Sequence, residues 1–199
     1  ANVLIIGGGI VGINAMQMSL GLGAKTTLLD VNSDTLSKIK ESYPSVNIAE
    51  SSKSVIESIL PTVDIIVGAV LTPGGKPPTV ITKEMLKLME PKTILSDVSV
   101  DQGGCFETSK PTTHDKPTYL VDDIIHYCVK NIPSAVPFTA TNALNEATRP
   151  FILKFANSGL NGMFNDNNLI MALNTFKGKL TNQEVAQAHN LKFVEAKEV

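Results

Sequence analysis

The chain has 199 residues, of which 43% are hydrophobic, and a formal net charge of −2. A charge so close to zero provides no basic surface for nucleic acid or for an acidic membrane. No apolar run approaches the roughly 18 residues of a membrane span, and no secretory signal precedes the first apolar run. Cys105 and Cys128 lack the spacing of a zinc site or a disulfide framework. We therefore predict a globular, cytoplasmic protein with free thiols, no metal and no nucleic-acid or membrane partner.

The first half of the chain alternates short apolar runs with stretches of helical periodicity. Strands are predicted at residues 2–6, 25–30, 46–49, 63–67 and 93–98. Helices are predicted after the first three strands, over 10–20 with Ile10, Ile13, Met16 and Leu20 on one apolar face, over 33–43 and over 53–59. Another helix is predicted to start at Thr82 and to hold Met85, Leu86 and Met89, whereas Thr72–Pro78 has the composition of a loop. This alternation predicts right-handed βαβ units and an α/β fold, a Rossmann-type doubly wound parallel sheet buried on both faces.

The pattern loosens after Val98. Short strands are expected at 118–121 and 124–128, and helical periodicity begins near Val136. Its apolar stripe contains Leu144, Ala147, Phe151 and Phe155, with a kink expected at Pro150 and an end at Gly159. The remaining residues indicate two or three short helices. We predict a dinucleotide-binding domain over residues 1–135 and a C-terminal helical segment over 136–199.

The run Gly7-Gly-Gly-Ile-Val-Gly12 follows the first predicted strand and opens the first helix. It contains G-x-G-x-x-G: Gly7 permits a tight turn, Gly9 lets a pyrophosphate approach the backbone, and Gly12 lets the helix pack on the strand. Asp30 ends the second strand eighteen positions beyond Gly12, close to the position of a ribose-binding carboxylate. A carboxylate there repels a 2′-phosphate, so NAD is the expected cofactor. The alternative is a glycine turn in an α/β domain that binds no nucleotide.

A second polar run, Asp97-Val-Ser-Val-Asp-Gln-Gly-Gly-Cys-Phe-Glu107, follows the fifth strand. In doubly wound sheets the ligand lies at the carboxyl ends of the strands, so this run should border the nicotinamide half of a dinucleotide. Asp101 would place a carboxylate near that ring. Gly103 and Gly104 add little bulk behind it, which leaves room for a substrate.

This run and three others resemble the alanine dehydrogenase family. The others are Gly68-Ala-Val-Leu71, Lys110-Pro-Thr-Thr-His-Asp115 and His126-Tyr-Cys-Val-Lys-Asn-Ile-Pro-Ser-Ala-Val-Pro137. The resemblance extends from residue 2 to about residue 160, and Asp-Gln-Gly-Gly-Cys is its most specific part. It implies NAD-dependent oxidative deamination of L-alanine to pyruvate and ammonia, in a homohexamer. Proton-translocating transhydrogenase has a related nucleotide domain, and a non-catalytic NAD-binding module is a third possibility.

Carried over residue by residue, the resemblance implies a cofactor site and one catalytic group. Ile10 and Val11 would contact the pyrophosphate. Asp30 would bind the ribose, and Ser52 would lie on the adenine side. The other implied cofactor-binding residues are Val70, Leu71, Val98, Ser99, Val100, Asp101, Lys110, Val129, Asn131 and Ile132, the last two at the nicotinamide end. Asp101 matches the acid–base carboxylate of the family. Lys110 stands where the family often has arginine, and it keeps the charge without the bidentate fork.

Several of these residues also have a structural interpretation. Ser52 is suited to cap a helix, and Asn131 to turn the chain before Pro133. Cys105 is interpreted as a small buried residue, and the histidines as structural. The chain opens on strand residues at Ala1, from which we expect a substrate-binding domain upstream. We therefore expect this segment by itself to bind NAD without oxidising alanine.

Overall fold

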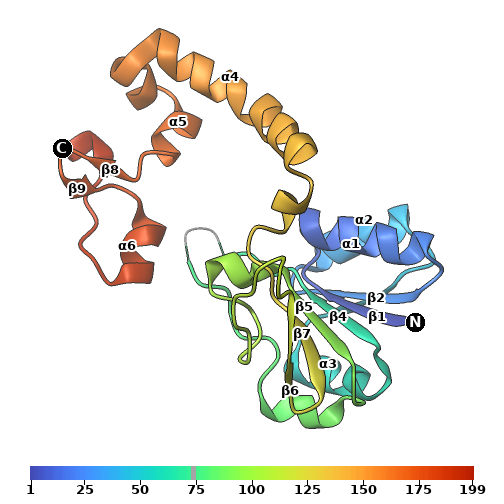
Figure 1. Cartoon of the computed structure of the whole chain (residues 1–199). Helices are drawn as coiled ribbons and strands as arrows, with labels where there is room; N and C mark the ends of the chain where they lie inside the picture. Colours follow the sequence, from blue (N-terminus) through green and yellow to red (C-terminus); the bar gives the residue numbers. More distant parts are fainter. Residues whose placement is uncertain (73–74) are drawn as a thin grey trace. The chain divides into compact units, whose positions relative to one another are not determined.

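The computed structural model of the chain describes residues 1–72 and 75–199, so Pro73 and Gly74 of the predicted loop lie outside the described residues. The chain divides into two compact units. The first comprises Ala1–Thr72 and Lys76–Ile132, and the second contains Pro133–Val199. Figure 1 shows both units with their elements labelled. Within the described residues, no helix combines the length and apolar character that a bilayer crossing requires.

The first unit is built on one seven-stranded sheet (Figure 1). Its strands are β1 (Asn2–Ile6), β2 (Lys25–Asp30), β3 (Asn47–Glu50), β4 (Ile65–Gly68), β5 (Ile94–Asp97), β6 (Thr118–Val121) and β7 (Ile124–Tyr127). Their order is β3-β2-β1-β4-β5-β7-β6. All neighbouring pairs are parallel except β6 and β7, which form an antiparallel hairpin at one edge. The predicted α/β fold of the Rossmann type is therefore confirmed.

Helices cover both faces of this sheet, so there is a core on each face. Successive side chains of β1 point to opposite faces and enter the two cores alternately. Val3 and Ile5 pack in the core with α1 (Ile10–Gly21) and α2 (Ser33–Ser42). Leu4 and Ile6 pack in the opposite core, with α3 (Lys53–Ile59) and the 3₁₀ segments η1 (Leu60–Thr62) and η2 (Glu84–Leu88). Burial on both faces explains why β1 is a continuous apolar run.

Two predictions for the first unit need correction. The segment after Thr82 is a short 3₁₀ helix, η2, although Met85, Leu86 and Met89 are buried in the expected way. Apolar residues spaced by three fit a 3₁₀ helix as well as an α-helix. Ile10 was placed on the apolar face of the first helix, but it is 84% exposed because it begins α1 at the rim of the sheet.

The second unit contains α4 (Pro137–Phe164), α5 (Asn167–Met171), α6 (Gln183–His189) and the 3₁₀ segments η4 (Ile132–Ala135, shared with the first unit) and η5 (Ala196–Glu198). Gly159 ends the first of two helical stretches within α4, as predicted. Its dihedral angles, φ 59° and ψ −157°, are not helical, and a second helical stretch follows it up to Phe164. Pro150 keeps helical dihedrals. A small hairpin of β8 (Thr175–Phe176) and β9 (Lys179–Leu180) was missed, although Lys177 and Gly178, both at positive φ, form its turn.

Candidate cofactor-binding site

The three glycines of the G-x-G-x-x-G motif are glycine for different structural reasons. A Cβ on Gly7, which has φ +109°, would lie 2.4 Å from the Ala69 carbonyl oxygen, and one on Gly12 would lie 1.8 Å from the Gly7 carbonyl oxygen. Both positions therefore require glycine for the packing of the protein itself. A Cβ on Gly9 would meet nothing within 4 Å. The fold does not explain glycine at this position, whereas a ligand that approaches the backbone does.

The N-terminus of α1, which Gly9 precedes, has no side-chain cap. Gly9 is the N-cap residue, it makes no side-chain cap hydrogen bond, and the first turn of α1 has no acidic residue. The first N–H groups of a helix have no partner within the helix, and the helix dipole adds positive potential at this end. In a twelve-residue helix that follows a glycine loop, these groups can bind the oxygens of a pyrophosphate.

Asp30 connects the end of β2 to the glycine loop. Its carboxylate accepts hydrogen bonds from the Gly8 N–H at 2.6 Å and from the Asn32 N–H at 2.8 Å. A carboxylate offers about four acceptor positions, so Asp30 can accept two further donors, as a ribose would supply. The Asn32 side chain caps α2 by accepting from the Thr35 N–H. Asp30 therefore has a structural role in the turn in addition to the predicted ribose contact.

A pocket of about 540 Å³ lies beside the glycine loop, where the loops after β1, β4 and β5 meet. β1 and β4 are the neighbouring strands at which the strand order reverses, and doubly wound sheets bind their ligands at this position. The predicted residues that line it are Gly9, Ile10, Val11, Val70, Leu71, Val98, Ser99 and Asp101. Ala69 and Gln102 also line it and were not predicted as site residues. Ala69 lies within the run Gly68–Leu71, and Gln102 directly follows Asp101. A pocket of equal volume in the second unit, lined by Thr181, Glu184 and Phe193 among others, has no glycine loop.

The remaining predicted residues lie outside the pocket lining. Ser52 caps α3 by accepting from the Val55 N–H at 3.3 Å, which agrees with its structural interpretation. Val100 and Val129 are buried, at 3% and 0% exposure. The N–H of Lys110 donates to the Tyr119 hydroxyl at 2.6 Å. Gly7, Gly12 and Asp30 shape the turn behind the pocket, and Asn131 and Ile132 follow β7.

A buried carboxylate that the sequence did not single out holds the loop after β5. Asp97 is fully buried, and one oxygen accepts from the Ser99 N–H at 3.0 Å. The other accepts from the Cys105 and Phe106 N–H groups and from the Ser109 hydroxyl. The Ser99 hydroxyl in turn donates to the Val70 carbonyl oxygen at 2.7 Å. Asp97 therefore fixes a wall of the pocket and connects it to the loop after β4.

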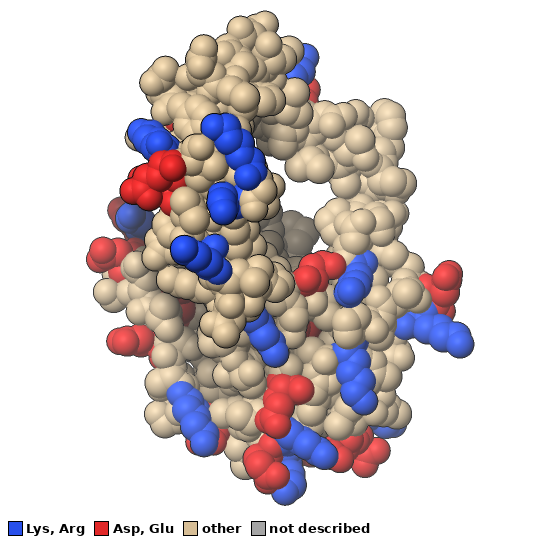
Figure 2. Space-filling model, turned by 90° about the vertical axis from the view of Figure 1, so that its left-hand side faces the viewer, with Lys and Arg blue, Asp and Glu red and all other residues tan. Residues whose placement is uncertain are grey.

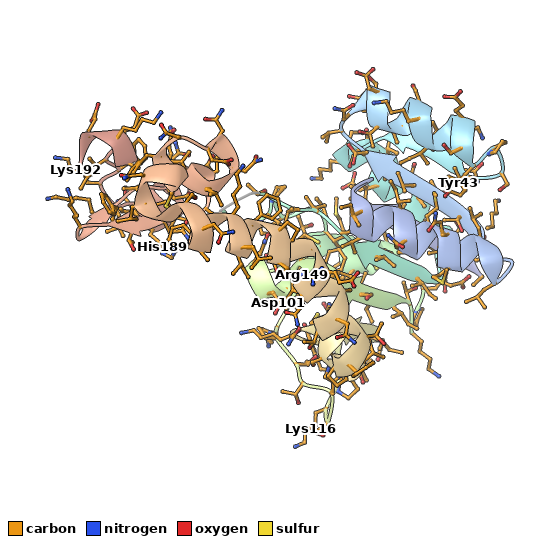
Figure 3. The ribbon with its side chains drawn as sticks, turned by 90° about the horizontal axis from the view of Figure 1, so that it is seen from above. Tyr43, Asp101, Lys116, Arg149, His189 and Lys192 are labelled. Atoms are coloured by element: carbon orange, nitrogen blue, oxygen red, sulfur yellow. The ribbon has the colours of Figure 1, made fainter. Side chains whose placement is uncertain are left out.

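Asp101, labelled in Figure 3, lies four residues further along the same loop, on the 3₁₀ segment η3 (Val98–Gln102). Its side chain is exposed. Both of its carboxylate oxygens accept from the Asn131 N–H, each at 3.2 Å. Asp101 thus contributes the negative charge of the pocket lining. Lys116 is at the tip of the following loop, away from Asp101 (Figure 3).

Cys105 and His126, two ionisable residues near this loop, are buried. Burial raises the pKa of the Cys105 thiol, and the charge of Asp97 adds to the effect. Cys105 is therefore a protonated core residue and not a nucleophile. Burial lowers the pKa of His126, whose ring nitrogens contact the Thr108 hydroxyl and the Ile124 carbonyl oxygen. Among the described residues, no group of three His, Cys, Asp or Glu side chains is placed to hold a metal.

On the face shown in Figure 2, acidic and basic side chains are interspersed, in line with the near-neutral composition. The glycine loop, the uncapped helix and the pocket at the reversal of strand order together define a Rossmann-type dinucleotide-binding domain.

Comparison with known proteins narrows this class to a family. The family model described as "Alanine dehydrogenase/PNT, C-terminal domain" matches residues 1–183. An alanine dehydrogenase of Halomonas elongata is 46% identical over 98% of this chain and 53% of its own length. Alanine dehydrogenase 2 of Staphylococcus aureus is 44% identical over 98% of this chain and 54% of its own length. The chain belongs to the alanine dehydrogenase/PNT C-terminal domain family, and it spans about half the length of these relatives.

Solved structures agree with this assignment. An L-alanine dehydrogenase superposes with a TM-score of 0.85 and 39% identity, over 96% of this chain and 53% of the other. A transhydrogenase from Sinorhizobium meliloti has a TM-score of 0.62 and 23% identity, over 70% of this chain and 40% of the other. The second likeness shows the shared fold alone.

Proposed function

We propose that this chain binds NAD and forms the cofactor-binding half of an NAD-dependent alanine dehydrogenase. The reaction is the reversible oxidative deamination of L-alanine to pyruvate and ammonia. The observation that carries the cofactor assignment is Gly9, a glycine that the fold does not need, at the uncapped start of α1 beside the pocket. The alanine dehydrogenases at 44–46% identity support the substrate, whereas the transhydrogenase resembles this chain in fold alone.

The residues present fit this cofactor along the carboxyl edge of the sheet. The pyrophosphate would lie on the N–H groups of Ile10 and Val11, and the adenosine ribose on Asp30, whose charge disfavours a 2′-phosphate. The apolar wall of Val70, Leu71 and Val98 would exclude water from the nicotinamide end. When bound, NAD would accept the hydride from the substrate Cα.

Asp101 is the group in this pocket that can move protons. Its exposed carboxylate can accept a proton from the water that attacks the imine of the substrate, and it can return that proton when ammonia leaves. The described residues that line the pocket include no lysine, arginine or histidine. We therefore propose that the cation that binds the substrate carboxylate comes from a separate substrate-binding domain. From the family resemblance we also propose that the complete enzyme is a cytoplasmic homohexamer.

Substitutions of two glycines at opposite ends of α1 test the cofactor assignment. A Cβ at Gly9 or at Gly21 meets nothing within 4 Å, so Gly9→Ala and Gly21→Ala should both leave the fold intact. Only Gly9→Ala should weaken the binding of NAD. The expected loss of binding free energy is about 1–3 kcal/mol, the usual effect of lost hydrogen bonds to a charged group. Isothermal titration with NAD and NADP measures both effects, and the unmodified chain should prefer NAD.

Equal losses of affinity in the two variants would contradict the pyrophosphate position, and equal affinities for NAD and NADP would contradict the role of Asp30. The substrate is tested separately, by alanine-dependent formation of NADH in the complete enzyme. Absence of that activity would contradict the alanine dehydrogenase assignment and leave the cofactor result standing.

A further inference from the structure

One of the polar side chains that line the pocket is almost completely buried. In the described lining the polar side chains are those of Ser99, Asp101 and Gln102. Asp101 and Gln102 are exposed, whereas Ser99, which directly follows Val98 of the apolar wall, is only 9% exposed. Burying a hydroxyl costs free energy unless it makes hydrogen bonds. The partners of the Ser99 hydroxyl therefore decide what this residue can do.

The proton of the Ser99 hydroxyl is used within the protein. Its Oγ lies 2.7 Å from the Val70 carbonyl oxygen. A carbonyl oxygen cannot donate, so the hydroxyl is the donor in this bond. A serine hydroxyl has a single proton and two lone pairs. Toward a ligand in the pocket, the Ser99 hydroxyl can therefore only accept a hydrogen bond.

The position of this acceptor is fixed from two sides. The Ser99 N–H donates to the buried Asp97 carboxylate at 3.0 Å, and the same carboxylate accepts from the Cys105 N–H at 2.9 Å. The hydroxyl is held by Val70 on the neighbouring loop. Both ends of the residue are thus ordered before a ligand arrives, which reduces the entropy lost on binding. A ligand group that faces Ser99 has to supply an N–H or an O–H.

We propose that Ser99 is a specificity-determining residue that accepts a hydrogen bond from the carboxamide NH₂ of the nicotinamide ring. The proposal rests on the proposed function, which places that ring against the wall that contains Val70 and Val98. The family resemblance includes Ser99 among the cofactor-binding residues without giving it a partner on the cofactor. A ring that has a ketone or a carboxylate in place of the carboxamide supplies no N–H. It would leave the buried acceptor unpaired, which is how polar sites reject close analogues.

The test compares NAD with 3-acetylpyridine adenine dinucleotide, in which an uncharged acetyl group replaces the carboxamide. By isothermal titration, the unmodified chain should bind NAD about three- to tenfold more tightly, the usual effect of one hydrogen bond. In Ser99→Ala the two affinities should lie within about twofold of each other, because the acceptor is gone. A purely structural hydroxyl, which only supports Val70, would weaken both dinucleotides equally. An unchanged ratio of affinities in Ser99→Ala, or equal affinities in the unmodified chain, would overturn the inference.

Ser19 supplies the matched control. It is half-buried on α1, and its hydroxyl donates to the Ala15 carbonyl oxygen at 2.8 Å, in a bond of the same kind. It is not among the residues that line the pocket. Ser19→Ala should therefore leave the ratio of the two affinities unchanged. A ratio that narrowed as much in Ser19→Ala as in Ser99→Ala would assign the effect to the loss of any such hydroxyl and overturn the inference.

A second measurement observes the hydrogen bond itself. With NAD labelled with ¹⁵N in its carboxamide, one NH₂ proton should lie downfield in the complex with the unmodified chain, relative to the complex with Ser99→Ala. Identical positions in the two complexes would overturn the inference. The two proposals fail in different ways. Failure of the unmodified chain to bind NAD would overturn the proposed function, whereas NAD binding with an unchanged ratio of affinities in Ser99→Ala would overturn this inference alone.

Discussion

Two carboxylates four residues apart in the same loop have opposite environments. Asp97 is fully buried and accepts from three backbone N–H groups, the Ser109 hydroxyl and the Cys105 thiol. Asp101 is exposed and accepts from a single N–H. Buried charges persist where hydrogen bonds replace their hydration. Asp97 is therefore part of the structure of the loop, whereas Asp101 is open to substrate and water.

We predict that Asp97→Asn destabilises the first unit. In either orientation the new amide NH₂ group faces buried donors, which leaves at least one of them unsatisfied. The expected loss in the free energy of unfolding is about 1–3 kcal/mol. Urea denaturation measures it, with Asp101→Asn as the control, which should change the free energy by less than about 0.5 kcal/mol because the site is exposed. Equal midpoints for Asp97→Asn and the unmodified chain would contradict the role assigned to Asp97.

At the scale of elements, β7 is the strand that completes the site. It lies between β5 and β6, parallel to the first and antiparallel to the second. His126 on β7 is fully buried and stacks on Tyr119 of β6, with ring centroids 5.0 Å apart. Its ring is also in contact with the Thr108 hydroxyl at 2.7 Å. The hairpin thus anchors the chain that continues to Asn131.

His126 should make stability depend on pH. Burial lowers its pKa in the folded state, whereas the unfolded value is about 6.5. Between these two values the unfolded chain binds more protons, so stability rises with pH there. The stabilisation that comes from keeping His126 neutral is fully present above about pH 6.5. It is lost as the pH falls from that value toward the lower pKa of the folded state.

The measurement is the urea midpoint at pH 7.5 and at pH 5.5. We expect a smaller difference between these midpoints in His126→Gln than in the unmodified chain. His189→Gln serves as the control because His189 is exposed on α6 and should leave the difference unchanged. If His126→Gln retained the full difference, the pH dependence would have to come from the carboxylates.

At the scale of the whole molecule, the two units differ in how well they bury their apolar residues. The first has a core on each face of its sheet. The described part of α4 has no buried residue, and Phe138, Leu144 and Ile152 are exposed by 82%, 64% and 62%. Exposed apolar surface of this extent is typical of an interface. The first unit can therefore fold around its own core, whereas α4 cannot bury its apolar residues within its own unit.

We expect the 199-residue chain, produced by itself, to bind NAD and not to oxidise alanine. The pocket supplies the dinucleotide contacts and one carboxylate, but its described lining has no cation for the substrate carboxylate. Steady-state assays beside the Halomonas elongata enzyme measure the activity, and residues 1–135 by themselves should keep the affinity for NAD. Turnover within about tenfold of that enzyme, a barrier difference of only ~1.4 kcal/mol, would place the whole substrate site inside this chain.

The sequence by itself determined the features that depend on neighbouring residues. β1, β2 and β6 have the predicted bounds, and Ser52 caps α3 as its position before a helical stretch suggested. The glycine loop and the position of Asp30 also followed from local spacing. Apolar periodicity, helix caps and glycine turns act over a few residues, so their signals are contained in short stretches of sequence.

Only the tertiary structure decided which of the predicted residues face the pocket. Val100 and Val129 belong to the core, and Asp97 rather than Asp101 organises the loop after β5. The contact between Asp101 and Asn131 joins residues thirty positions apart. It forms because β7 enters the sheet beside β5. Strand order arises from packing between distant segments, and periodicity in a sequence specifies the elements without specifying their neighbours.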